Sequence, residues 1–335
     1  MSRPTVAVGT TGGTISMTAR AGEAVQPTLG ADELLASVPG LGEVADVVTS
    51  TLATVPGAHL APADVVAFGD WAARAVEDAD GAVLVQGTDT IEETAYLLDL
   101  LWDRSEPLVV TGAMRPAQAA GADGPANLLA AAVVAGSAGA RDRGVLVTLD
   151  DDVHAATRVR KRDSTAPHAF GSEPFGPLGR VHERAVTFVS PAGRWPALPT
   201  PESGRDPRVA LLETHVGDRG ELLRLVARAG YDGVVLAGFG VGHVSAELAA
   251  VIGEVAPELH VVLASRTGSG PVLRSTYGFP GSELDLVARG AVPAGWLDPR
   301  KARLLVWALL AGGSGPDHVR QVVEERGRAP WGPPG

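Results

Sequence analysis

Short runs of apolar residues alternate along the chain with longer segments in which apolar residues recur at helical spacing. Near-continuous Val- and Leu-rich runs are typical of parallel strands that are buried on both faces. The pattern predicts buried strands at Thr5–Gly9, Ala82–Gln86, Leu108–Gly112, Val145–Leu149, Val209–Glu213, Gly233–Gly238 and Val261–Ser265. It predicts helices between them at Pro62–Ala79, Thr90–Arg104, Pro125–Ala138, Glu221–Ala229 and Arg300–Leu310.

This alternation predicts an α/β fold whose parallel strands are joined by right-handed crossovers. The pattern stops in the segment 191–207, which is rich in Pro, Gly and charged residues and has no periodicity. We interpret this segment as an interdomain linker. The predicted organisation is a larger, flavodoxin-like N-terminal domain with a parallel sheet (residues 1–190) and a smaller C-terminal α/β domain (residues 208–335).

Composition narrows the class of protein. Of the 335 residues, 45% are hydrophobic and 20% are charged, which is typical of soluble globular proteins. A net charge of −11 makes nucleic acid and anionic membranes poor partners. The absence of cysteine excludes disulfides, thiolate metal sites and a cysteine nucleophile. Neither a signal peptide nor a membrane span is recognisable, so we expect a cytoplasmic protein.

The first candidate site is the segment 6–16, in which an apolar strand ends in a glycine-rich turn with three threonines. In an open α/β sheet, ligands bind at the carboxyl ends of strands. Nucleotide binding is the main rival function, but the spacing fits neither GxGxxG nor a P-loop. Because small residues suit any tight turn, this turn alone is equally consistent with a structural role.

The second candidate site is the segment 83–94, where another predicted strand ends in Gly-Thr-Asp-Thr just before a helix. The helix N-terminus adds backbone N–H groups and a positive dipole to the same crevice. Thr90 and Glu93 have the spacing of a capping box. Asp89 has a structural explanation as a helix-cap carboxylate, whereas Thr88 is harder to explain in that way.

The third segment, 157–165, is basic, and its structural interpretation is a solvated surface stretch. If it is extended, a period of two places Arg158, Arg160 and Arg162 on one face and Lys161 on the other. Lys161 then turns inward while the arginines stay in solvent. The nearby arginines disfavour a charged lysine, which helps Lys161 to act as a base.

Taken together, these segments resemble the bacterial L-asparaginase family in order and spacing. The matching motifs, besides the Lys161 segment, are TTGGTIS, QGTDTIEET, TGAMRP, ADGPANL, YGFPGSE and LDPRKARLL at residues 10–16, 86–94, 111–116, 122–128, 277–283 and 297–305. The resemblance covers nearly the whole chain. It implies a two-domain α/β amidohydrolase that uses no metal or other cofactor and is usually a homotetramer built from close dimers.

The resemblance also implies catalytic roles. Thr14 attacks the side-chain amide of L-asparagine, forms an acyl-enzyme and releases ammonia. Thr88, Asp89 and Lys161 resemble a second triad, in which the lysine and the aspartate position Thr88 so that it orients and activates water. Asp89 is also expected to receive the α-ammonium group of the substrate. The division of work between the two threonines stays open.

Several expected substrate-binding residues depart from the family pattern. Gly57 and Ala58 stand where relatives usually have a Ser and a polar residue, so we expect backbone N–H groups at Gly57 to bind the substrate instead. Residues 16–30 lack the tyrosine that well-known members carry, and Tyr277 is hypothesised to enter a site. Glu283 matches a residue donated to the neighbouring subunit, which implies at least a dimer; its alternative is a surface loop acid.

Three functions stay open. The leading one is an L-asparaginase, possibly with glutaminase side activity. A second is an amidase for a different amino-acid-like amide. A third is a non-catalytic amino-acid-binding homologue, which the changed pocket residues permit, including His243 where close relatives often carry Asn. The retained set of Thr14, Thr88, Asp89 and Lys161 favours an enzyme.

Overall fold

The computed structural model describes residues 3–13, 17–18, 26–27, 31–191, 193–202, 204–328 and 332. Thr14, expected to be the nucleophile, lies outside the described residues, as does most of the segment 16–30. The chain divides into two compact units, Met1–Ala197 and Leu198–Gly335. The boundary between the units falls within the segment 191–207, whose role as a linker stays a prediction.

The N-terminal unit is built on an eight-stranded sheet with the order β12-β11-β8-β7-β6-β5-β1-β4. Its strands are β1 (Thr5–Thr10), β4 (Asp46–Thr51), β5 (Gly81–Val85), β6 (Leu108–Thr111), β7 (Val145–Leu149), β8 (Asp152–Ala155), β11 (Gly179–His182) and β12 (Ala185–Phe188). Its helices are α1 (Ala31–Ala36), α2 (Leu41–Val44), α3 (Pro62–Ala75), α4 (Ile91–Leu101) and α5 (Gly124–Ala135), with short 3-10 helices η2 (Gly57–His59), η3 (Thr88–Thr90) and η4 (Ala138–Ala140). Two small sheets pair β2 (Met17–Thr18) with β3 (Gln26–Pro27) and β9 (Arg160–Lys161) with β10 (Phe170–Gly171).

The strands β1, β4, β5, β6 and β7 pair in parallel. Numbered in chain order, they lie in the sequence 2-1-3-4-5 across the sheet, which is the flavodoxin-like order. The predicted α/β fold is therefore confirmed. The strand order reverses between β1 and β5, and ligands of such sheets bind at the carboxyl ends beside this switch point.

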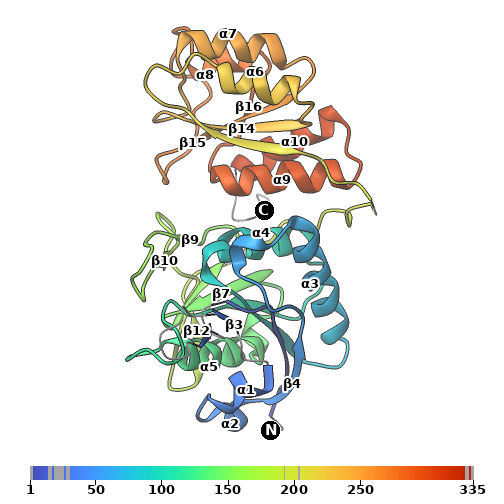
Figure 1. Ribbon diagram of the computed structural model, residues 1–335, viewed down its shortest axis with the longest axis vertical. Helices are drawn as coiled ribbons and strands as arrows, with labels where there is room; N and C mark the ends of the chain where they lie inside the picture. Colours follow the sequence, from blue (N-terminus) through green and yellow to red (C-terminus); the bar gives the residue numbers. More distant parts are fainter. Residues whose placement is uncertain are drawn as a thin grey trace. The chain divides into compact units, whose positions relative to one another are not determined.

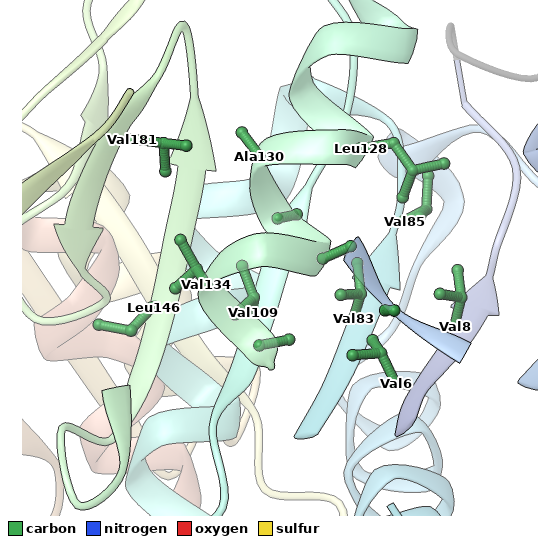
Figure 2. Packing of buried hydrophobic residues seen from close by; sticks show 14 of the residues in the cluster. Val6, Val8, Val83, Val85, Val109, Leu128, Ala130, Val134, Leu146 and Val181 are labelled. Carbon is green, nitrogen blue, oxygen red and sulfur yellow. The ribbon is translucent and has the colours of Figure 1, made fainter. Parts of the chain in front are cut away.

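Helices cover both faces of this sheet: α3 and α4 lie on one face, and α1, α2 and α5 lie on the other (Figure 1). Figure 2 shows Val83, Val85 and Val109 packing toward Leu128 and Val134 of α5. Burying a side chain of this size contributes about 1.5–3 kcal/mol. Burial on both faces explains the continuous apolar runs in the sequence, and it makes the strand ends a rigid base for a site.

The C-terminal unit has a four-stranded parallel sheet with the order β13-β14-β15-β16. Its strands are β13 (Val209–Glu213), β14 (Gly233–Gly238), β15 (His260–Ser265) and β16 (Val292–Pro293). Its helices are α6 (Glu221–Arg228), α7 (Ala246–Val255), α8 (Glu283–Ala288), α9 (Pro299–Ala311) and α10 (Pro316–Arg328). Helices α6, α7 and α8 cover one face, and α9 and α10 cover the other (Figure 1). Within the described part of the chain, no helix is both long and apolar enough to cross a membrane.

The predicted strands agree with the observed ones to within one residue at each end. Three predicted helices were too long, because α3 ends at Ala75, α4 ends at Leu101 and α5 ends at Ala135. The apolar pattern missed β4, which lies at the edge of the sheet and alternates between exposed and partly buried residues. An edge strand needs no continuous apolar run, because one side of it faces solvent.

Candidate active site

The carboxyl ends of β1 and β5 are held together by their backbones. Just past β1, the N–H of Thr11 donates to the carbonyl of Val85 at 2.9 Å. Gly13 then packs against Gly87, since a Cβ atom on Gly13 would lie 2.2 Å from the Gly87 nitrogen. The φ angle of Gly13 is +89°, a conformation that other residues rarely adopt. The glycine-rich turn therefore brings the first sequence motif into contact with the second.

Thr88 and Asp89 form the turn η3, which leads directly into α4. The Nζ atom of Lys161 donates hydrogen bonds to Thr88 Oγ1 and to Asp89 Oδ1, each at 3.0 Å. Thr88 is buried, the Lys161 side chain is 14% exposed and that of Asp89 is 71% exposed. An amine is thus placed to exchange a proton with a hydroxyl, while an open carboxylate beside it can meet a cationic group from solvent.

A buried glutamate holds the other end of the lysine. The Oε2 atom of Glu92 accepts a hydrogen bond from the backbone N–H of Lys161 at 3.0 Å, and Glu92 is buried. Glu92 is not among the site residues that the sequence predicts. The available signal was an acidic residue in the first turn of a helix that is otherwise largely buried.

The neighbouring arginines only partly follow the sequence prediction. Val159 is fully buried, as the alternation requires, and Arg162 is half-exposed and pairs with Glu173. Arg158, however, is partly buried with its guanidinium 5.4 Å from the Phe175 ring, and this burial lowers its pKa. The prediction that the arginines stay in solvent is wrong for Arg158, against which the loop that carries Phe175 packs, and for Arg160, which is partly buried at its Nε atom.

Gly57 and Ala58 form the start of η2, where Gly57 is buried and Ala58 is exposed. The hydroxyl of Thr90 donates to the Gly57 carbonyl at 3.2 Å and accepts from Gln86 Nε2 at 3.3 Å. Thr90 makes no side-chain capping bond, so the predicted capping box with Glu93 is wrong. The hydroxyl instead ties the Gly57 turn to the start of α4.

A second polar network supports the segment after β6, which packs against Thr88. Gly112, the residue after β6, packs against the η3 turn. A Cβ atom on Gly112 would lie 3.3 Å from Thr88 Cγ2. Asn127 Nδ2 donates to the Gly112 carbonyl at 3.0 Å, and Asp123 accepts from the backbone N–H groups of Met114 and Arg115 at 2.9 Å. The ADGPANL motif therefore positions the TGAMRP segment.

Glu283 and Tyr277 belong to a separate cluster in the C-terminal unit. Glu283 Oε1 accepts from the backbone N–H groups of Thr276 and Tyr277 at 2.7 and 2.6 Å, and Oε2 lies 3.0 Å from His243 Nε2. The Tyr277 ring is half-exposed and packs edge-on against His243, 5.0 Å away. Because the Glu283 side chain is fully buried within its unit, the alternative of a surface loop acid is wrong.

The charge of Glu283 is stabilised within this cluster. Desolvation by itself acts to raise the pKa of Glu283, but hydrogen bonds from the backbone N–H groups of Tyr277, Glu283 and Thr276 and from His243 outweigh it. The pKa of Glu283 consequently lies below its ordinary value. Among the described residues, no group of three or more His, Asp or Glu side chains is arranged to hold a metal ion.

Comparison with protein families gives a specific result. A family model described as "Asparaginase, N-terminal" matches residues 5–193, and one described as "Glutaminase/Asparaginase C-terminal domain" matches residues 208–323. This chain belongs to the asparaginase family. The family resemblance of the sequence motifs is thereby confirmed.

Individual asparaginases align over most of the chain. The "Probable L-asparaginase" of Deinococcus radiodurans is 37% identical over 81% of this chain and 83% of its own length. The "Glutaminase-asparaginase" of Pseudomonas fluorescens biotype A is 33% identical over 84% of this chain and 78% of its own. The crystal structure of a "Probable Cytoplasmic L-asparaginase" from Campylobacter jejuni matches with a TM-score of 0.84 and 30% identity, over 96% of this chain and 99% of that one.

Proposed function

We propose that this chain hydrolyses the side-chain amide of L-asparagine to L-aspartate and ammonia, with glutaminase side activity. The observation that carries the proposal is the contact of Lys161 Nζ with both Thr88 Oγ1 and Asp89 Oδ1, in a chain of the asparaginase family. Relatives named L-asparaginase and glutaminase-asparaginase support the substrate class.

The proposed reaction proceeds through an acyl-enzyme. A threonine hydroxyl is a weak nucleophile at neutral pH and needs an adjacent base. Thr14 Oγ1 attacks the amide carbon, the C–N bond breaks, and the leaving nitrogen departs as ammonia after taking up the hydroxyl proton. Water oriented by Thr88 then attacks the acyl carbon, and the proton of the water is relayed through Thr88 and Lys161, whose amine is hydrogen-bonded to Thr88. The ester bond breaks, aspartate leaves, and the proton returns to Thr14.

The presence of a lysine rather than an arginine at position 161 supports a role in proton transfer. Of the 28 Lys and Arg residues in the chain, Lys161 and Lys301 are the only lysines. An arginine stays protonated in proteins, whereas a lysine can give up and regain a proton. Arginine occupies both neighbouring positions, Arg160 and Arg162, so a need for positive charge alone does not explain a lysine between them.

The substrate is proposed to be held at both ends. Asp89, which is largely exposed, receives the α-ammonium group. The Gly57 and Ala58 turn, joined to the N-terminal end of α4 through Thr90, offers backbone N–H groups and a positive helix end to the α-carboxylate. Glu283 of a neighbouring copy adds a second negative charge near the α-ammonium group without contacting it, because its carboxylate is bonded within its own unit, and the two charges favour an amino-acid substrate.

An assembly is part of this proposal. In a homodimer or homotetramer, Glu283 acts on the site of the neighbouring copy. Its carboxylate is buried against its own unit, so the rings of His243 and Tyr277 form the face that the partner meets. Light scattering of the purified protein tests this point, because a monomer at assay concentration with full activity contradicts it. A cytoplasmic location, which the name of the Campylobacter jejuni relative includes, is tested by cell fractionation.

The decisive experiment follows ammonia release from L-asparagine and from L-glutamine. The variants are Thr14→Ala and Thr88→Ala, with Thr187→Ala, at an exposed position of β12, as the matched control. Each catalytic variant is expected to lose about 10³-fold or more in kcat, while the control keeps full activity. No release by the unmodified protein contradicts the proposed function, and release that survives both catalytic substitutions contradicts the mechanism.

A further inference from the structure

We propose that Glu92 is a positioning residue of this site: its carboxylate holds the backbone of Lys161 so that the lysine amine reaches Thr88 and Asp89. The geometric part of the proposal rests on hydrogen bonds within the N-terminal unit. Its kinetic part rests on the proposed amide hydrolysis. Glu92 is not proposed to touch the substrate.

Lys161 is attached at two points to one short piece of chain, residues 88–92. Its amine contacts Thr88 Oγ1 and Asp89 Oδ1 at 3.0 Å, and its backbone N–H donates to Glu92 Oε2 at 3.0 Å. This piece consists of η3 and the first turn of α4, and Ile91 within it is fully buried. These two attachments to residues 88–92 hold both the backbone of Lys161 and its amine in place.

The strand that carries Lys161 needs an anchor of this kind. β9 pairs only with β10 in the described part of the chain, through Phe170 opposite Lys161 and Gly171 opposite Arg160. A two-stranded ribbon is at best marginally stable by itself. The lysine side chain adds a flexible four-carbon stem. A charged acceptor forms a stronger bond to a backbone N–H than a neutral one does, so a buried carboxylate is well suited to hold the ribbon against α4.

The same helix provides a matched comparison. Asp99 Oδ1 accepts a hydrogen bond from the backbone N–H of Val145 at 2.9 Å. Position 99 lies seven residues after position 92, which places the two carboxylates on one face of α4. Both join α4 to the backbone of another segment. The Asp99 bond holds β7 of the main sheet and does not involve Lys161, so it separates general anchoring from positioning of the lysine.

The kinetic test compares Glu92→Met, Glu92→Gln and Asp99→Leu. Methionine and leucine fill the volume without an acceptor, and glutamine keeps an acceptor oxygen. Because a misplacement of about 1 Å costs about 10²-fold in rate, Glu92→Met is expected to lower kcat about 10- to 100-fold with KM changed less than about 3-fold. Glu92→Gln is expected to keep kcat within about 3-fold. Asp99→Leu is expected to lower the denaturation midpoint and leave kcat unchanged.

A second measurement reads the position of the lysine without turnover. With two lysines in the chain, lysine labelled with 13C at Cε gives two NMR resonances, and Lys161→Arg assigns the one from Lys161. Glu92→Met is expected to shift the Lys161 resonance and to leave that of Lys301 in place, whereas Asp99→Leu moves neither.

Three outcomes overturn the proposal: an unmoved Lys161 resonance in Glu92→Met, a Glu92→Gln variant as slow as Glu92→Met, or a loss of kcat in Asp99→Leu as large as in Glu92→Met. If the unmodified protein releases no ammonia, the proposed function fails by itself. The resonances then still decide whether Glu92 positions Lys161.

Discussion

The Nε2 atom of His243 lies 3.0 Å from Oε2 of Glu283 and completes the hydrogen bonding of a fully buried carboxylate. The other oxygen accepts two backbone N–H groups, from Thr276 and Tyr277. Removing the carboxylate therefore takes the charged acceptor away from three partly buried hydrogen bonds. This arrangement makes Glu283 a structural element of the loop before α8, whatever it contributes to a neighbouring site.

Glu283→Ala is expected to lower the free energy of unfolding of the protein by about 2–4 kcal/mol, because three hydrogen bonds to one carboxylate are lost and a bond to a charged group contributes about 1.5–3 kcal/mol. Urea denaturation followed by circular dichroism measures this change. Glu247→Ala, at an exposed position in the first turn of α7, serves as the control and is expected to stay within about 0.5 kcal/mol. Equal effects of the two substitutions would show that the Glu283 bonds contribute little.

Gly13→Ala is expected to lower kcat/KM about 10²-fold, since misplacing catalytic groups by about 1 Å has an effect of that size. The added Cβ atom would meet Gly87 at 2.2 Å, which forces the first motif away from the Thr88 turn. Gly42→Ala is the control, because a Cβ atom there meets nothing within 4 Å. Gly42 lies within α2, so its variant is expected to be fully active and up to about 1 kcal/mol more stable. Normal kinetics of Gly13→Ala would contradict the tight packing.

Thr90→Val is expected to raise KM for L-asparagine about 5-fold with little change in kcat. The substitution keeps the shape of the side chain but removes the hydrogen bond to the Gly57 carbonyl, and one such bond contributes about 1 kcal/mol. Steady-state kinetics measure the effect, with Thr90→Ser as the variant that restores the bond. A fall in kcat at constant KM would place Thr90 in the chemical step and would contradict a role for the Gly57 turn in binding.

Acidification is expected to destabilise the protein through His260 at the start of β15. Desolvation by burial is the main cause that lowers the pKa of His260; Asp232 opposes it and Arg320 adds to it. The folded state therefore takes up the proton less readily than the unfolded state, whose histidine titrates near about 6.5. Stability from this group is fully present above about pH 6.5 and is lost as the pH falls toward the lower folded-state pKa.

His260→Gln removes this contribution. As the pH falls from 7 to 5, the free energy of unfolding of the variant is expected to rise relative to that of the unmodified protein. Denaturation curves at several pH values measure it. A difference that stays constant across this range would show that His260 titrates equally in both states.

The sequence by itself determined seven of the parallel strands, the α/β class and the family. Buried parallel strands need apolar residues on both faces, and this need appears directly as runs such as Val145–Leu149 and Gly233–Gly238. The motifs around Thr88 are short and contiguous, so they could be recognised without knowing what packs against them. Helix ends were predicted less accurately, because an amphipathic pattern continues past the last turn that packing supports.

Only the tertiary structure decided what these motifs contact. The family resemblance grouped Lys161 with Thr88, but no pattern in the sequence predicted that the backbone of Lys161 bonds Glu92. Local rules also failed where a tertiary partner competed. The hydroxyl of Thr90 bonds the Gly57 carbonyl instead of capping its helix, and Arg158 is partly buried near Phe175 instead of staying in solvent. In each case the free energy of a contact between distant segments outweighs the preference that the neighbouring residues express.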